Sequence, residues 1–372
     1  MTLTIGDIYR TAYQFGMEKD YRGAQVIRET LLSHAKSLRE LCEKAGFAFR
    51  CEADDLEGAQ QEFERIYDEA YKHYCAIKDD SRLTRLEKAR KCGELLDIIS
   101  FTLDDLKHPY YDTRILFGEP SAEVKKVLVG IDITPADVAL AKQEGALLIA
   151  HHPQSYAAQR LPLILDKQPY IWEKEFGIPL EMGLSIIAAR KDIITRKLTT
   201  ENLEHTLSHA RLEGVPLICI HTPCDNLTEW YLVEMFRKEQ IRTARDIVDL
   251  FLILPEFEYY RNNRKIKPQV HSRLGCDPPV TKYFVDMAGG TAGPEVMYEF
   301  LGKYGVGTLI NMHIPELNLE EAYRHHMTVI VAGHHASDSL GVNLMLDEIE
   351  RRFSVTLECL DVAGFKRFKR GA

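Results

Sequence analysis

The sequence predicts an α/β fold with two lobes, preceded by an all-helical N-terminal extension. Residues 1–107 contain many helix formers at helical spacing and few strand signals. From residue 124 onward, short apolar runs alternate with stretches of helical periodicity, which is typical of a sheet flanked by helices. We therefore expect a helical extension (1–107), a first α/β lobe (108–255) and a second α/β lobe (256–372).

In the extension, the apolar residues recur every three or four positions, as on one face of a helix. Breaks are expected at 44–47 and 79–82, where charged residues meet Gly or Ser. The pattern predicts a helical bundle or arm, built on residues such as Val26, Ile27, Leu31, Leu38, Phe63, Ile66, Leu95 and Ile98.

In the first lobe, four apolar runs predict strands, and the stretches between them predict helices. The strands are expected within 124–132, 146–153, 183–190 and 215–225, and the helices within 134–144, 199–212 and 227–238.

Residues 254–282, rich in Pro, Asn and charge, predict a linker, a hairpin or a crossing between lobes. The alternation then resumes. Strands are expected within 283–293, 307–316, 328–338 and 355–362, and helices within 294–304, 319–325 and from 336 to 352.

The composition excludes several classes of protein. The chain of 372 residues has a formal net charge of −9, which argues against a sequence-independent nucleic-acid binder, because such a binder needs a basic surface. No apolar stretch is long enough for a membrane span, and the N-terminus does not read as a signal peptide. The eight cysteines show no paired CxxC spacing, so we expect reduced thiols in a cytoplasmic protein.

Three of the apolar runs end in polar clusters that could converge on a metal. The carboxyl ends of strands line the ligand crevice of an open α/β sheet, and imidazole with carboxylate is a ligand set for zinc, manganese or iron(II). The alternative for each histidine is a hydrogen-bonded structural group at a strand end. The three clusters are His151 and His152, His221 and Asp225, and His334 and His335 with Asp338.

A glycine-rich stretch follows the strand expected at 283–287. Gly289, Gly290 and Gly293 precede Pro294 at an expected helix start, so free backbone N–H groups could bind an anion such as phosphate. The spacing matches neither the dinucleotide-binding nor the P-loop motif, and a tight turn without a ligand is the alternative.

The ordered motifs "IAHHP", "IHTPCDNL", "AGGTAG" and "AGHHASDSLG" resemble those of the Nif-three-like dinuclear-metal family, whose members are also known as type two homologues of GTP cyclohydrolase one. The likeness spans residues 110–365. It implies two divalent ions in a cleft between two α/β lobes, and assembly as a homohexamer. The metal ligands that it implies are His151, His152, Asp225, His334 and Asp338.

This sequence departs from the family pattern at two places near the expected site. Asp338 stands where the family usually has Glu, so we expect it to bridge less easily, with His335 as a possible replacement ligand. His313 stands where the family often has an acid. The helical residues 1–107 also lie outside the family pattern.

The resulting functional hypothesis is a metal-dependent hydrolase acting on a small substrate, which a nucleotide or another phosphate-bearing molecule would fit. Of His221 and His335, the one that is not a ligand is the candidate general acid/base. The alternative is a metal-binding scaffold whose helical extension binds a protein partner. GTP ring opening is implied only by the family resemblance.

Overall fold

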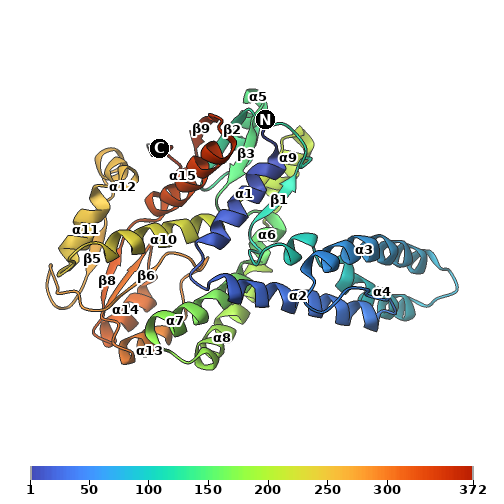
Figure 1. Cartoon of the computed structure of the whole chain (residues 1–372), viewed down its shortest axis with the longest axis horizontal. Coiled ribbons are helices and arrows are strands. Elements are labelled where there is room, and N and C mark those ends of the chain that lie inside the picture. The colour runs from blue at the N-terminus through green and yellow to red at the C-terminus, as the bar shows by residue number, and fades with distance from the viewer. Residues whose placement is uncertain (1, 371–372) are drawn as a thin grey trace. The chain divides into compact units, whose positions relative to one another are not determined.

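The computed structural model describes residues 2–370, which form two compact units. One unit is Gly23–Pro109, and the other combines the chain up to Arg22 with the chain from Tyr110 onward. The second unit carries two sheets flanked by helices, whereas the first is helical (Figure 1). The predicted fold class, an α/β core with a helical N-terminal region, is confirmed.

The unit Gly23–Pro109 is a bundle of three helices and a short 3₁₀ turn. Its elements are α2 (Ala24–Lys44), α3 (Leu56–Asp79), α4 (Arg85–Ile99) and η1 (Leu103–Leu106). Side chains cap the N-termini of two of the helices. At α3, Asp55 accepts from the Gly58 N–H, and at α4, Thr84 forms a capping box with Glu87. Leu38 and Ile66 are fully buried at its centre. The apolar residues that recur at helical spacing in the sequence therefore form the core of this unit.

The other unit contains a five-stranded sheet and a four-stranded sheet. In the first, of order β1-β4-β3-β2-β9, only β1 runs antiparallel to its neighbour; in the second, of order β5-β8-β7-β6, only β5 does. The strands are β1 (Arg114–Phe117), β2 (Lys126–Gly130), β3 (Leu147–Ala150), β4 (Leu217–Cys219), β5 (Gln269–His271), β6 (Tyr283–Asp286), β7 (Thr308–Asn311), β8 (Thr328–Val331) and β9 (Glu358–Val362).

The helices of this unit cover both sheets (Figure 1). Helices α1, α10 and α15 pack together, and α1 and α15 bury apolar side chains against the five-stranded sheet. The helices are α1 (Ile5–Glu18), α5 (Pro135–Glu144), α6 (Ser155–Gln159), α7 (Gln168–Phe176), α8 (Leu180–Leu198), α9 (His205–Glu213), α10 (Thr222–Arg237), α11 (Ala244–Leu252), α12 (Pro255–Tyr259), α13 (Met297–Lys303), α14 (Glu316–Arg324) and α15 (His334–Phe353), with η2 (Leu161–Lys167) and η3 (Tyr260–Arg264).

The structure differs from the sequence prediction in three places. Residues 183–190 were expected as a strand but lie inside α8, whose buried residues Gly183, Ile187 and Ile194 recur at helical spacing. Strand β9, which the prediction assigned to the second lobe, pairs with β2 of the five-stranded sheet. Helix α1, assigned to the extension, belongs to the α/β unit. None of the described helices could span a membrane.

A cluster of buried charges lies beneath α10. Lys167 is buried and donates to the side-chain oxygen of Asn226. Glu229, also on α10, is buried as well. Burial raises the pKa of Glu229 to about 8, with Lys167 lowering it and Asp286 and Asp20 raising it. This carboxyl group is therefore protonated in the folded chain near neutral pH.

We expect Glu229→Gln to remove part of the pH dependence of folding. Because the pKa of Glu229 is raised to about 8, the folded state binds the proton more tightly than the unfolded state. Stability therefore falls as pH rises toward 8, by at most about 1.4 kcal/mol per pH unit from this group. Urea unfolding between pH 6 and 9, followed by the fluorescence of Trp172 and Trp230, should show a shallower fall in the variant.

The control for this prediction is Glu234→Gln, because Glu234 lies on the same helix but is substantially exposed. We expect that variant to keep the pH profile of the unchanged chain. Equal slopes for Glu229→Gln and the unchanged chain would contradict the prediction.

Candidate functional site

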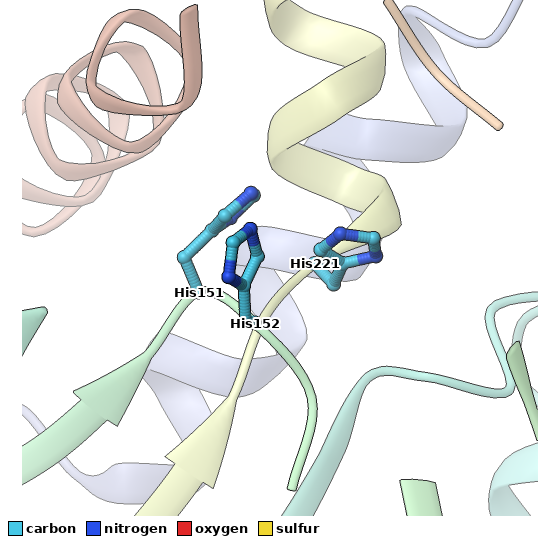
Figure 2. A group of neighbouring side chains, drawn as sticks. All are labelled: His151, His152 and His221. Atoms are coloured by element: carbon cyan, nitrogen blue, oxygen red, sulfur yellow. The ribbon is translucent and has the colours of Figure 1, made fainter. Parts of the chain in front are cut away.

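Three strand ends of the α/β unit carry the histidines and aspartates of the candidate site. His151 and His152 directly follow β3, and His221 follows β4 as the residue that caps α10. Strands β3 and β4 are parallel neighbours, so these three imidazoles lie close together at one edge of the sheet (Figure 2). His334 begins α15 just after β8 of the other sheet.

Hydrogen bonds orient three of the imidazoles in the same way. The Nδ1 atom of His151 lies 3.2 Å from the Ile220 carbonyl oxygen, that of His152 lies 2.6 Å from Asp132 Oδ1, and that of His221 lies 2.6 Å from Asp112 Oδ2. Each Nδ1 faces an oxygen acceptor, and a ring that donates to this acceptor through Nδ1 can offer Nε2 to a metal ion. Metal-binding histidines commonly show this arrangement.

The Nε2 atoms face two buried carboxylates, Asp225 and Asp338. His151 Nε2 lies 3.3 Å from Asp225 Oδ1 and 3.6 Å from Asp338 Oδ1. The other oxygen of Asp338 lies 3.4 Å from His152 Nε2 and 3.5 Å from His334 Nε2. Asp338 thus presents one oxygen to each of two groups of imidazoles, although its side chain is one methylene shorter than Glu.

A close contact between two helices brings these carboxylates together. A Cβ atom at Gly341 of α15 would lie 2.1 Å from the carbonyl oxygen of Cys224 on α10. The Thr228 hydroxyl of α10 also donates to the Ser337 carbonyl of α15. Only glycine permits this approach, which brings Asp225 in the first turn of α10 close to Asp338, one turn into α15.

The donor set fits divalent metal ions. Three groups of side chains bring one potential ligand atom each to within 4.8 Å of one another. Four atoms that face this site, namely His151 Nε2, Asp225 Oδ1 and both oxygens of Asp338, are buried and have no hydrogen-bond partner among the described residues. Buried polar atoms without partners are costly unless something binds them. The three groups are His151, His152 and His221; His152, His334 and Asp338; and His151, Asp225 and Asp338.

The charges of the site shift the pKa values of its groups strongly. Burial lowers the pKa of His151, but Asp338 and Asp225 outweigh burial and hold it well above its usual value. Burial lowers the pKa of His334 to about 4. Burial raises the pKa of Asp338, yet the neighbouring imidazoles, above all His151, bring it well below its usual range. Asp338 is therefore ionised, as a metal ligand must be.

His335 lies beside the site but outside the three groups. Its Nε2 atom lies 3.1 Å from Asp132 Oδ2, while Asp132 Oδ1 bonds His152. The rings of His335 and Tyr260 are stacked, with centroids 6.3 Å apart. Asp132 thus connects His335 to His152 of the candidate site.

A cavity of about 490 Å³ opens onto the site. Its wall includes His152, His221, His334 and both carboxylates, and also the segment Gly289–Gly293 predicted as an anion loop. Gly290, with φ of 70°, brings this segment against His221: a Cβ atom there would lie 3.7 Å from His221 Cε1. His313, noted in the sequence as an unusual residue, lines the cavity and stacks on His334 at 4.9 Å between centroids.

Several residues of the site were missed by the sequence analysis. Asp132 follows a predicted strand, so its position at a strand end was a usable signal. Asp112 precedes β1 instead, and Arg190 lies within the segment predicted as a strand. Asn311, two residues before the noted His313, also lines the cavity.

Two sheets that meet at a histidine- and aspartate-rich centre define a class of two-lobed α/β protein with a candidate metal site, and similar structures are known. A crystal structure of a NIF3 superfamily protein from Sphaerobacter thermophilus shares 28% identity at a TM-score of 0.60, over 68% of this chain and 91% of that one. HcgD from Methanocaldococcus jannaschii in its reduced form (14% identity, 66% and 87% coverage, TM-score 0.39) and TTHA1606 from Thermus thermophilus (16%, 75% and 98%, 0.41) are more distant.

No family model and no curated protein matches the chain. The likeness to the Sphaerobacter protein supports a NIF3-like family assignment for this chain. The resemblance drawn from the sequence motifs is thereby confirmed.

Proposed function

We propose that this chain is a metal-dependent hydrolase with two divalent ions at the histidine and aspartate centre. The observation that carries the proposal is the set of buried, unpartnered ligand atoms on His151, Asp225 and Asp338, because both aspartates line a cavity of about 490 Å³. A structural metal site is closed by protein atoms, whereas a catalytic one borders space for water and substrate.

The proposed ligands divide into two sets that share Asp338. One set is His152, His334 and Asp338; the other is His151, Asp225 and Asp338, with His221 beside it. The ions are zinc, manganese or iron(II), the metals that prefer imidazole with carboxylate. When bound, such ions lower the pKa of water toward neutrality and polarise the bond under attack.

The side chains around the ligands orient them and move protons. Asp112 and Asp132 accept from the Nδ1 atoms of His221 and His152 and hold both rings toward the centre. Of the two acid/base candidates from the sequence, His221 lies with the ligands and His335 bonds Asp132 outside the cavity wall. We propose His313 for proton transfer, because it is the imidazole of the cavity wall outside the three groups.

Metal analysis tests the ligand assignment. We expect up to two divalent ions per purified chain, and we expect the double variant His152→Ala/Asp225→Ala to lose them, since it removes ligands from both sets. The matched control is His325→Ala/Asp249→Ala, which removes one histidine and one aspartate far from the three groups. Full metal content in the first double variant would overturn the assignment.

Turnover separates a hydrolase from the alternative, a metal-binding scaffold. The metal-loaded chain should hydrolyse at least one member of a panel of nucleotides, phosphodiesters and cyclic amides, and His152→Ala/Asp225→Ala should not. Full metal content without turnover on the panel would favour the scaffold. The exposed apolar side chains Tyr71, Leu86 and Leu96 of the helical unit would then be its candidate partner surface.

The homohexamer implied by the family resemblance is a further part of the proposal. Sedimentation of the full chain measures the assembly directly. A cytoplasmic location is proposed from the sequence alone.

A further inference from the structure

The cavity at the candidate metal centre has a second polar region away from the histidines. It is formed by Arg190 of α8, the segment 289–293 after β6, and Asn311 at the end of β7. None of these groups belongs to the three candidate metal groups. The region therefore needs an explanation of its own.

Within residues 2–370, one nitrogen of the Arg190 guanidinium group is hydrogen-bonded, and the other two are not. Its Nε atom donates to the carbonyl oxygen of Ala292 at 3.1 Å. Its two terminal nitrogens donate to none of the described residues. A guanidinium group fixed through Nε presents a planar pair of donors, which suits two oxygens of one anion.

The backbone of the adjacent segment supplies further unused donors. None of the N–H groups of residues 288–293 donates to an acceptor within residues 2–370, although every residue of this segment is buried or half-buried. Gly290 keeps its backbone close to Leu161 and His221, because a Cβ atom there would lie 2.7 Å from Leu161 Cδ2. Buried N–H groups without acceptors are rare in proteins.

Asn311 gives independent evidence for a ligand. It is 7% exposed, and its Oδ1 atom is buried without a hydrogen-bond partner. Asn311 on β7 is the register partner of Asp286 on β6, and the segment 288–293 follows β6 in the chain. This oxygen is an acceptor, so it can bind a hydroxyl or N–H group of the occupant, and leaving it unpaired costs free energy.

Two carboxyl groups, Glu201 and Asp286, also line the cavity. Asp286 accepts from Gln168 Nε2 at 3.2 Å and lies in the field of buried Lys167. Its charge is thus partly offset by neighbours that are not cavity ligands, whereas Arg190 has no carboxylate partner among the described residues. Arg190 is the unpaired cation of this wall.

We infer that Arg190 and the N–H groups of 289–293 form a subsite for an oxyanion, a phosphate or carboxylate group carried by the substrate of this cavity, and that Asn311 Oδ1 accepts from a hydroxyl or N–H group of the same substrate. This inference rests on the proposed function, because it names the substrate class of the same cavity. The substrate would be a small molecule with its oxyanion at Arg190 and its reacting bond at the histidine and aspartate centre.

The experiment measures oxyanion binding with the metals removed, so that binding to ions does not contribute. Inorganic phosphate and malonate are titrated separately into the full chain after treatment with a chelator, by calorimetry at fixed ionic strength. We expect at least one of them to bind, and Arg190→Gln to weaken that binding about tenfold or more, the cost of losing a charged hydrogen-bond pair. The oxyanion that binds more tightly identifies the group that the substrate carries.

Arg196→Gln is the matched control, because Arg196 lies on the same helix and pairs with Asp192 at the surface. Arg190→Lys is a second variant, which keeps the positive charge but removes the planar pair of donors; it is also expected to weaken binding, and it decides the outcome if Arg190→Gln does not fold. Binding that is absent, or unchanged in both subsite variants, would overturn the inference. Metal content, expected to be unchanged in Arg190→Gln, separates this outcome from a failure of the proposed metal centre.

Discussion

Asp338→Asn should leave the chain without bound metal, whereas Asp225→Asn should leave about one ion of two. The two carboxylates differ in the number of imidazoles they face. Asp338 has His151 on one oxygen and His152 and His334 on the other, at 3.4 to 3.6 Å. Asp225 faces His151 at 3.3 Å and His221 at 3.6 Å, both belonging to one of the proposed ligand sets.

The substitution by Asn keeps the shape of the side chain and removes its charge. An amide nitrogen offers two N–H donors and no lone pair, so the shared oxygen pair of Asp338 would be lost. The measurement is the metal-to-protein ratio by elemental analysis after dialysis. Asp347→Asn is the control, because Asp347 lies on the same helix and pairs with Arg367 away from the site.

Equal metal loss in Asp338→Asn and Asp225→Asn would contradict the shared role of Asp338, and full retention in Asp338→Asn would contradict its role as a ligand. The test also addresses the position where the sequence has Asp in place of the Glu that is usual in the family. Asp338 is fully buried on α15, four residues after His334, and the contact of Gly341 with α10 brings this part of the helix close to the centre. We attribute the reach of the shorter acid to this helix contact.

The sequence predicted those site residues that come directly after the parallel strands in the chain. An apolar run that ends in His or Asp is visible in the sequence, and parallel strands bring their carboxyl ends to one edge. The same rule could not find Asp112, because β1 is antiparallel to β4, so the residues before β1 lie beside the residues after β4. The hydrogen bond between Asp112 and His221 depends on this antiparallel pairing.

The wrong prediction of a strand at 183–190 has a different physical cause. Its run of apolar residues is short, and a short run does not distinguish a buried strand from the buried face of a helix. The residues that follow show that the segment is helical. Helix α8 continues to Leu198, and Ile194 is buried about two helical turns beyond Ile187. Because the segment is helical, Arg190 is placed where it can bond Ala292 and line the cavity.

A buried ion pair supports the candidate site from the opposite side of α10. Asp20 accepts two bonds from the Arg22 guanidinium, at 3.1 and 2.8 Å, and one from the Tyr110 hydroxyl at 3.0 Å. It also accepts from Asn226 Nδ2 at 3.1 Å, and Asn226 directly follows Asp225. The network thus holds the first turn of α10, where Asp225 lies.

We expect Asp20→Ala to lower the free energy of unfolding of this unit by about 3 to 5 kcal/mol, because the Arg22 guanidinium would remain buried without a partner. Burial raises the pKa of Asp20, but Arg22 and Lys167 bring it well below its usual value. The stabilisation is therefore present above about pH 4 and is lost as pH falls further. Urea unfolding followed by the fluorescence of Trp172 and Trp230, at pH 7 and below pH 4, measures both effects.

The chain contains a matched control for this prediction. Asp80 and Arg82 have the same sequence separation and the same pattern of bonds, including Nη2 to Oδ2 at 2.8 Å, but the Arg82 side chain is 86% exposed. Water solvates both partners when the pair is broken, so Asp80→Ala should leave the unfolding midpoint by circular dichroism unchanged. A similar loss of unfolding free energy in both variants would mean that burial does not determine the strength of the ion pair. A negligible loss in Asp20→Ala would mean that Tyr110, Asn226 and water replace Asp20 as partners of Arg22.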